Sequence, residues 1–211
     1  MTMTLYVGTP AKSSWSLRPF LALAHTGATF ELTTIELDQP DTAAKLAALS
    51  PTGRVPVLDH DGLVIPDSLA ICEYLAELFP EAQLWPLDRA ARARARAVSC
   101  EMHSGFAALR RDMPMSLLED RHGQGQTLEA AADIRRVHQL WHTALAASGG
   151  PFLFGRFTIA DAMFAPVATR FTTYGVELDA TCRHYVATLA ALPAMSRWLG
   201  DGVRPVSPPI L

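Results

Sequence analysis

Near its N-terminus the sequence reads Thr4-Leu5-Tyr6-Val7, a short connection, and then Lys12-Ser13-Ser14-Trp15-Ser16-Leu17-Arg18-Pro19-Phe20. The first run is typical of a strand, and the second begins an amphipathic helix that we expect to extend to about Ala24. A second strand is predicted over residues 30–37. Residues 53–58 then lead into a β-hairpin around the turn Asp59-His60-Asp61-Gly62. Together with a helix over residues 69–79, this order of strands and helices predicts a thioredoxin-like α/β domain.

Beyond residue 80 the pattern changes from alternating strands and helices to helices alone. The segment after Leu84-Trp85-Pro86 is dominated by Ala, Arg, Leu and Met. Helical periodicity predicts helices over residues 88–112, 128–147, 159–174 and 181–192. A last short helix is predicted from Pro193, whose fixed φ suits a first helical turn. The sequence therefore predicts a thioredoxin-like domain over residues 1–82, followed by an all-helical bundle over residues 88–211.

The overall composition restricts the kind of partner. Of 211 residues 49% are hydrophobic, which supplies enough apolar surface for sizeable cores. The formal net charge of −3 provides no basic field for a nucleic acid, so we expect a small-molecule partner. No apolar run reaches the length of about 18 residues that a membrane span needs. No pattern of a signal peptide is present either, so neither membrane insertion nor export is indicated.

The cysteines and histidines indicate a reducing compartment and no metal centre. Cys72, Cys100 and Cys182 are far apart, form no CxxC pair, and are predicted to be buried thiols. Such thiols fit a reducing compartment, and we expect a cytoplasmic protein. No HExxH sequence and no closely spaced Cys/His set is present, so no metal site is predicted.

Four short motifs occur in an order that resembles the signatures of cytosolic glutathione transferases. They are the run from Ser13 to Pro19, Gly53-Arg54-Val55-Pro56, Asp67-Ser68, and Thr158-Ile159-Ala160-Asp161. Within that family the chain is most similar to bacterial serine-type members near the zeta class, which includes maleylacetoacetate isomerases. Zeta members usually carry Ser-Ser-Cys where this chain has Ser13-Ser14-Trp15. The resemblance covers nearly the whole chain and implies glutathione as a co-substrate.

Chemistry on glutathione needs its sulfur as a thiolate. A cysteine thiol has a pKa of about 8.5, so the protein must favour the charged form at neutral pH. A hydroxyl that donates to the sulfur at the positive end of a helix dipole can do this. Ser13, five residues before Arg18, matches the position of the family's active hydroxyl or cysteine, and Ser14 is the alternative. Either serine could instead only cap the helix.

The neighbours of these serines limit the reaction further. Ser16 lies three residues after Ser13, where a thioredoxin-like redox protein has its second cysteine, so disulfide exchange is excluded. Conjugation, isomerisation and thiol-dependent elimination remain open. Trp15 could line the acceptor pocket or pack between the domains. Arg18 is expected to make a structural ion pair.

The resemblance also implies which residues bind the glutathione backbone. Pro56 would follow a cis peptide bond, and Val55 would then face the cysteinyl amide so that the tripeptide binds as an added strand. Ser68 would hydrogen-bond the γ-glutamyl carboxylate and Asp67 would contact its amine, at a helix start that favours anions. Arg54 could attract the glycyl carboxylate or lie on the surface. Read without the resemblance, Pro56 marks an edge or a turn, and Asp67 or Ser68 an N-cap.

The acceptor side is predicted on the helix over residues 88–112. Met102, Phe106, Leu109 and Met113 follow helical spacing and form core by default, and Phe106 is also a candidate for the acceptor pocket. His103 and Arg110, seven residues apart, share another face that could meet the acceptor. Further along, Thr158 and Asp161 form the pattern of a capping box, so we interpret Asp161 as structural.

These features together predict a glutathione transferase that conjugates or isomerises a small electrophile. Family members usually pair through the helix over residues 69–79 and the helix that carries Arg89, Arg92 and Arg96, so a two-fold homodimer is expected. The alternative is a non-catalytic protein of the same fold that binds ligands or a protein partner, because a fold does not determine a function. The identity of the acceptor is not encoded in these motifs.

Overall fold

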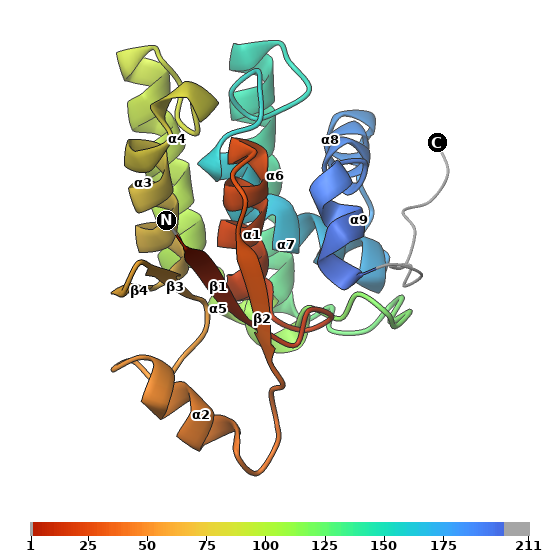
Figure 1. The fold of residues 1–211 in the computed structure, drawn as a ribbon. Coiled ribbons are helices and arrows are strands. Elements are labelled where there is room, and N and C mark those ends of the chain that lie inside the picture. The colour runs from red at the N-terminus through yellow and green to blue at the C-terminus, as the bar shows by residue number, and fades with distance from the viewer. Residues whose placement is uncertain (1, 201–211) are drawn as a thin grey trace.

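The computed structural model describes residues 2–200. In chain order the elements are β1 (Met3–Gly8), α1 (Ser14–Thr26), β2 (Glu31–Ile35), α2 (Thr42–Leu49), β3 (Val57–His60), β4 (Leu63–Pro66), α3 (Ser68–Leu78), the short 3-10 helix η1 (Pro80–Ala82), α4 (Arg89–Ser104), α5 (Ala107–Asp112), α6 (Leu128–Ser148), α7 (Ile159–Tyr174), α8 (Ala180–Ala190) and α9 (Pro193–Leu199). Strands and helices alternate first and helices alone follow (Figure 1), so the predicted fold class is confirmed. The domain boundaries at 1–82 and 88–211 stay a prediction, and residues 201–211 of the second range lie outside the described residues.

The strands form one mixed sheet in the order β2-β1-β3-β4. β1 is parallel to β2, with Leu5 opposite Leu32, and antiparallel to β3, with Leu5 opposite Leu58. Met3, Leu5 and Val7 are buried, as expected for alternate residues of a strand whose one face meets helices. α1 and α3 pack against each other and against this sheet. The predicted βαβ unit and hairpin are therefore present.

The helix α2 is absent from the sequence prediction. Six of its eight residues are Ala or Leu, so no polar face marks a helical period in the sequence, and only Leu46 is buried. Figure 1 shows α2 on the opposite side of the sheet from the other helices. Such a helix forms from good helix formers in its sequence rather than from a packed face, and periodicity alone does not detect it.

The long helix predicted over residues 88–112 is in fact two helices, α4 and α5. Gly105 ends α4, and its N–H donates to the carbonyl of Glu101. A Cβ atom at Gly105 would lie only 2.8 Å from that oxygen. Phe106 has a φ of +60°, which no residue inside a right-handed helix can adopt. Phe106 is nevertheless buried with Met102, Leu109 and Met113, so the predicted core is present although the predicted helix is wrong.

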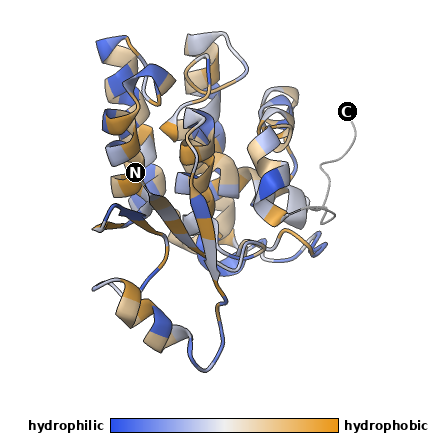
Figure 2. Cartoon of the chain, in the orientation of Figure 1, coloured by the Kyte–Doolittle hydropathy of each residue, from blue (hydrophilic) through white to orange (hydrophobic). Residues whose placement is uncertain are grey.

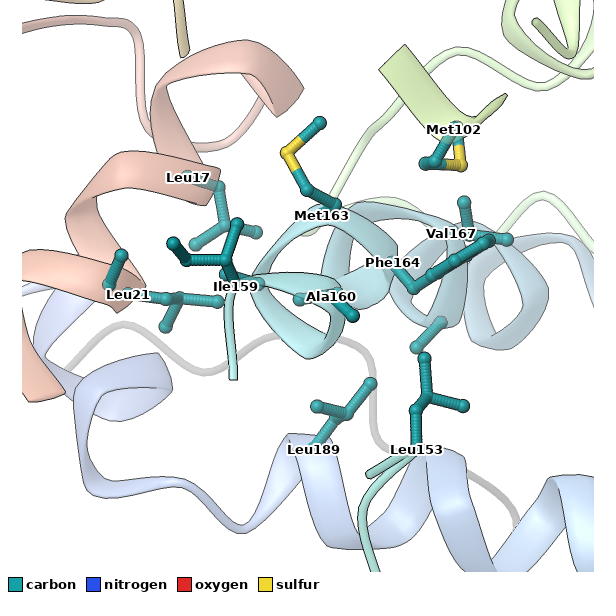
Figure 3. Packing of buried hydrophobic residues seen from close by; sticks show 14 of the residues in the cluster. Leu17, Leu21, Met102, Leu153, Ile159, Ala160, Met163, Phe164, Val167 and Leu189 are labelled. Carbon is teal, nitrogen blue, oxygen red and sulfur yellow. The ribbon is translucent and has the colours of Figure 1, made fainter. Parts of the chain in front are cut away.

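α7 is the central helix of the second part of the chain. Every residue of α7 except Thr169 is buried, which is typical of a helix surrounded by other elements. It packs against α1, α4 and α8. Figure 3 shows Ile159 of α7 near Leu17 and Leu21 of α1, with Phe164 and Val167 further along α7 toward Met102 of α4. One continuous core therefore joins α1 to the helical part.

Thr158 and Asp161 form the predicted capping box at the start of α7. One carboxylate oxygen of Asp161 accepts from the N–H of Thr158 at 2.8 Å. The other accepts from the N–H of Leu153 and from the hydroxyl of Tyr185, both at 3.0 Å. Burial raises the pKa of Asp161 to about 6, although these hydrogen bonds lower it. The side chain thus ties α7 to α8 and to the loop before α7, and we interpret its role as structural.

The surface follows the expected amphipathic pattern, with one exception among the cysteines. α3, α4 and α6 carry both hydrophilic and hydrophobic residues along their length (Figure 2). Cys72 and Cys182 are buried as predicted, whereas Cys100 is exposed. Cys100 lies between Ser99 and Met102, which are on the buried face of α4, but it points off that face.

Among residues 2–200, none of the helices combines the length and apolar character needed to cross a bilayer.

Candidate functional site

A cavity of about 400 Å³ brings together most of the predicted site residues. Its lining comes from the start of α1, the connection between α2 and β3, the start of α3, and α4, and consists of Trp15, Thr52, Arg54, Val55, Pro56, Asp67, Ser68 and His103. The volume is within the range of about 300 to 1,000 Å³ that is usual for small-molecule sites. All five residues predicted to bind glutathione line this cavity, together with two of those predicted for the acceptor.

The start of α3 presents a strained residue and an unpartnered hydroxyl to this cavity. Asp67 is the N-cap of α3, and its carboxylate accepts from the N–H groups of Leu69 at 2.8 Å and Ala70 at 3.1 Å. Its φ is +78°, an uncommon value for a residue with a side chain. The second carboxylate oxygen lies 3.2 Å from Nε2 of His103. The hydroxyl of Ser68 is buried and has no hydrogen-bond partner within residues 2–200.

The connection before β3 contributes an exposed cation beside a buried proline. The peptide bond between Val55 and Pro56 is cis. Pro56 is buried at the start of the strand region, while Arg54 is exposed at the cavity. The guanidinium of Arg54 is therefore available to an anionic group bound in the cavity. Thr52 also lines the cavity, and no motif in the sequence singles it out.

Ser13 and Ser14 lie at the start of α1, nearly buried and next to Trp15 in sequence, but neither is among the lining residues. Ser13 is the N-cap residue, yet its side chain makes no capping hydrogen bond. Its hydroxyl donates instead to Oγ of Ser16 at 2.8 Å. Oγ of Ser14 accepts from Nη2 of Arg170 at 3.2 Å. The two hydroxyls therefore have different partners, although they are adjacent in sequence.

The loop before α1 is held by residues from the second part of the chain. Nε1 of Trp198 donates to the carbonyl of Pro10 at 2.8 Å. The N–H of Leu117 donates to the carbonyl of Ala11 at 3.0 Å. With the bond from Arg170 to Ser14, three donors from distant segments position the residues around Ser13. We refer to residues 10–14 as the serine loop.

Arg170 is a buried cation with neutral partners. Besides Ser14, its guanidinium donates to the carbonyls of Met113 at 2.8 Å and Pro166 at 3.0 Å. Burial, together with the nearby charge of Arg110, lowers the pKa of Arg170 to about 9. Sequence reasoning missed this residue. The available signal was a single arginine inside a helix that carries no other charge except Asp161 at its start, because a fully buried charge is rare.

Trp15 is in contact with two arginines, one from its own helix and one from α5. The guanidinium of Arg18 is 4.3 Å from its ring centroid and that of Arg110 is 4.5 Å away. The ring also meets His103 edge to face at 5.2 Å. Arg18 is fully buried, and none of its three guanidinium nitrogens has a hydrogen-bond partner within residues 2–200. Among residues 2–200 the predicted ion pair of Arg18 is absent, and a cation–π contact with Trp15 takes its place.

Arg110 and Phe106 differ from the other predicted acceptor residues. Arg110 donates to the carbonyls of Gly105 at 3.0 Å, Met102 and His103, which closes the C-terminal end of α4. It reaches the site through Trp15 and does not line the cavity. Phe106 is buried between α4 and α5 and does not line it either. Because the helix breaks at Gly105, the shared face predicted for His103 and Arg110 does not exist.

Comparisons with known proteins agree with this geometry. Residues 12–78 match the family model "Glutathione S-transferase, N-terminal domain", and residues 89–201 match "Glutathione S-transferase, C-terminal domain". The chain is 32% identical to a probable maleylacetoacetate isomerase of Caenorhabditis elegans over 87% of each chain. It is 31% identical to the maleylacetoacetate isomerase of Rattus norvegicus, over 87% of this chain and 86% of the rat protein.

A solved structure gives the same result at the level of the fold. A glutathione transferase homologue from Burkholderia (strain BGR1), crystallised with bound glutathione, superposes with a TM-score of 0.71. It is 29% identical in sequence, and the match covers 94% of this chain and 96% of the other.

Proposed function

This chain belongs to the glutathione S-transferase family, and from that membership we propose that it activates the thiol of glutathione through a serine hydroxyl and transfers the thiolate to a small electrophile. The observation that carries the proposal is the single cavity that gathers Arg54, Asp67 and Ser68 beside the start of α1. Each of these side chains is suited to one polar group of the tripeptide. Glutathione is the co-substrate of this family, and the Burkholderia homologue was solved with it bound.

We propose that glutathione is held by charges at its two ends. The hydroxyl of Ser68, which is buried without a partner among residues 2–200, would donate to the γ-glutamyl carboxylate, while the carboxylate of Asp67 would contact the ammonium group. Arg54 would attract the glycyl carboxylate across the cavity. Val55 would meet the cysteinyl part through its backbone. Bound in this way, the tripeptide would have its sulfur toward the start of α1.

The thiolate would form at Ser13, with Ser14 as the alternative donor. A hydrogen bond to a charged partner contributes about 1.5 to 3 kcal/mol, and the N-terminal end of α1 adds about 0.3 to 1 kcal/mol. Lowering a thiol pKa by two units requires about 2.7 kcal/mol. One hydroxyl at the helix start therefore provides most of the stabilisation that the anion needs.

Two reactions on the acceptor fit the site. In conjugation the thiolate forms a C–S bond at an electrophilic carbon, and the leaving group departs with its electron pair. In isomerisation the thiolate adds to one carbon of a cis double bond, the resulting single bond rotates, and the thiolate leaves again to give the trans product. The similarity to maleylacetoacetate isomerases favours an unsaturated acid of that kind as one acceptor. Trp15 and His103 would border the acceptor, because both line the cavity.

The proposal is tested by measuring binding, ionisation and turnover on one protein preparation. Calorimetry with glutathione, the pH dependence of thiolate absorbance, and turnover of chlorodinitrobenzene and of maleylacetoacetate are the required assays. We expect saturable binding, a thiol pKa below about 8.5 and turnover of at least one acceptor. Saturable binding with an unchanged thiol pKa and no turnover of either acceptor would instead establish a binding protein of the same fold.

A Ser68→Ala variant should separate binding from chemistry. Removing the hydroxyl deletes one hydrogen bond to a charged group that is made equally in the ground state and the transition state, so we expect KM for glutathione to rise about tenfold or more with little change in kcat. Steady-state kinetics with glutathione varied at saturating acceptor measure both constants. A fall in kcat with an unchanged KM would place Ser68 outside the glutathione site.

The proposal includes a two-fold homodimer formed through α3 and α4. Arg94 and Arg96 are exposed on α4, and Arg96 pairs with Glu73 of α3 at 3.0 Å, so the two helices present one charged surface. Sedimentation equilibrium at several salt concentrations measures the assembly. A monomer at every concentration of protein used in the kinetics would refute this part.

A further inference from the structure

Ser16 is a fully buried polar residue in the first turn of α1, and its hydroxyl accepts two hydrogen bonds. The N–H of Gly8, the last residue of β1, donates to Oγ of Ser16 at 3.1 Å. The hydroxyl of Ser13 donates to the same atom at 2.8 Å. Within residues 2–200 the proton of Ser16 itself has no acceptor. A hydroxyl has one proton and two lone pairs, so both lone pairs of Ser16 are in use and its proton is free.

In this structure the hydroxyl of Ser13 donates to Oγ of Ser16, with the two oxygens 2.8 Å apart. The proton of Ser16 can turn toward Ser13 only after the proton of Ser13 has turned away. A thiolate is an acceptor with no proton to give. If the proton of Ser13 turns to a thiolate, the oxygen of Ser13 loses its role as donor to Ser16 and becomes able to accept from Ser16.

We propose that Ser16 is a positioning residue for the thiolate donor: it accepts from Ser13 when the site holds no thiolate and donates to Ser13 when the Ser13 proton moves to the glutathione sulfur. This inference depends on the function proposed above, with Ser13 as the donor. The hydrogen bonds then form a chain from the N–H of Gly8 to Ser16, to Ser13, and to the sulfur. Successive bonds in such a chain polarise one another, and each strengthens the next.

Local packing supports a fixed position for this chain. Ser16 is fully buried and Ser13 is only 6% exposed, so water does not compete freely for either oxygen. Gly8 leaves room for Ser13, because a Cβ atom at residue 8 would lie 3.0 Å from Oγ of Ser13 and 2.8 Å from a methyl carbon of Leu37. The hydrogen-bond chain starts at the backbone N–H of Gly8, which belongs to β1 and cannot rotate away. The hydroxyls therefore have a rigid donor behind them.

The arrangement also gives a buried serine at the third residue of α1 a structural role. A buried hydroxyl without partners would destabilise the fold. Here the hydroxyl satisfies the N–H of Gly8, which lies at the end of the strand, and orients Ser13 at the same time. Alanine at residue 16 would leave the N–H of Gly8 and the hydroxyl of Ser13 without this shared partner.

The test is a double-mutant cycle on the thiol pKa of bound glutathione, measured from thiolate absorbance across pH. Ser16→Ala is combined with Ser13→Ala, and Ser16→Cys keeps the volume of the side chain with a much weaker hydrogen bond in case the alanine variant does not fold. Ser99→Ala is the matched control, because Ser99 is equally buried on a helix but lies on α4, and its hydroxyl has no hydrogen-bond partner among residues 2–200. Circular dichroism and thermal unfolding verify that every variant is folded.

We expect Ser16→Ala to raise the thiol pKa by about half a unit to one unit, which corresponds to a roughly three- to tenfold loss of thiolate at neutral pH. The same substitution in the Ser13→Ala background should cause no further rise, because Ser16 acts only through Ser13. Ser99→Ala should leave the thiol pKa unchanged. A purely structural role of Ser16 would alter stability without this dependence on Ser13.

Two results would overturn the inference, and they are distinguishable. If wild-type protein lowers the thiol pKa but Ser16→Ala and Ser16→Cys do not raise it, or raise it equally in both backgrounds, Ser16 does not act through Ser13 and the proposed function stands. If wild-type protein binds glutathione without lowering the thiol pKa, the proposed function fails and the role of Ser16 fails with it.

Discussion

A Ser13→Ala variant is expected to bind glutathione with its thiol largely protonated at neutral pH, and to lose about 10- to 100-fold in kcat/KM with every acceptor. The hydroxyl of Ser13 is the proposed donor to the sulfur, and a donor to a charged group contributes about 1.5 to 3 kcal/mol. Its removal should therefore raise the thiol pKa by about one to two units. Thiolate absorbance across pH and steady-state kinetics measure the two effects independently.

Ser14→Ala is the matched comparison, because the two serines are adjacent and equally buried. This variant deletes the acceptor for Nη2 of Arg170 and leaves a buried donor without a partner, which costs about 1 to 3 kcal/mol of stability. We expect a lower unfolding temperature and a smaller rise in the thiol pKa than in Ser13→Ala. If Ser14→Ala abolishes the thiolate while Ser13→Ala retains it, the donor is Ser14 and the assignment to Ser13 is wrong.

An Asp161→Ala variant should lose more stability than Ser14→Ala or Ser68→Ala. The carboxylate accepts from Leu153, Thr158 and Tyr185 in a fully buried position. Alanine leaves these donors without partners, each at a cost of about 1 to 3 kcal/mol, so the unfolding free energy should fall by at least about 3 kcal/mol. For a chain of this length that corresponds to a fall of about 6 to 12 °C in Tm. An unfolding temperature within about 2 °C of wild type would contradict the structural role.

The same carboxyl group should make stability depend on pH. Its pKa is raised from an ordinary value of 3.8 to about 6 by burial. Between these values the folded chain holds a proton that the unfolded chain has lost, so the contribution of Asp161 to the unfolding free energy decreases as pH rises through this window, by about 3 kcal/mol in all. Urea unfolding of wild type and Asp161→Asn at about pH 4 and pH 7 measures this contribution of Asp161 to the free energy of unfolding. The advantage of wild type should be larger at the lower pH, and an equal difference at both would argue against the raised pKa.

The elements that could be predicted from sequence are those whose side chains repeat with a clear period or carry a local signal. β1 alternates, α7 is largely apolar and begins with a capping box, and α9 begins at a proline. The break between α4 and α5 could not be predicted in this way. The spacing of Met102, Phe106, Leu109 and Met113 continues across the break as if the helix did, because all of them face one core. Only the backbone conformation at Gly105 and Phe106 differs from that of a continuous helix.

The candidate site likewise has one part that could be predicted from sequence and one part that could not. Residues carried by family motifs, such as Val55, Pro56, Asp67 and Ser68, lie together in one cavity. The partners of the serines were not predicted. Arg170 reaches Ser14 across 156 positions of sequence, and no local pattern reports a contact of that range. The expected ion pair of Arg18 is absent among residues 2–200 for a similar reason. The packing of Trp15 determines what surrounds that guanidinium.

The contacts that hold the serine loop have a consequence for the synthesis of the protein on the ribosome. Its backbone is held by Leu117 and Trp198, and Ser14 by Arg170, all of which are translated long after the strands that precede and follow the loop. A nascent chain that has emerged only as far as α3 therefore lacks the supports that orient its hydroxyls. The proposed activation of glutathione by Ser13 therefore requires that translation has reached α9, which carries Trp198.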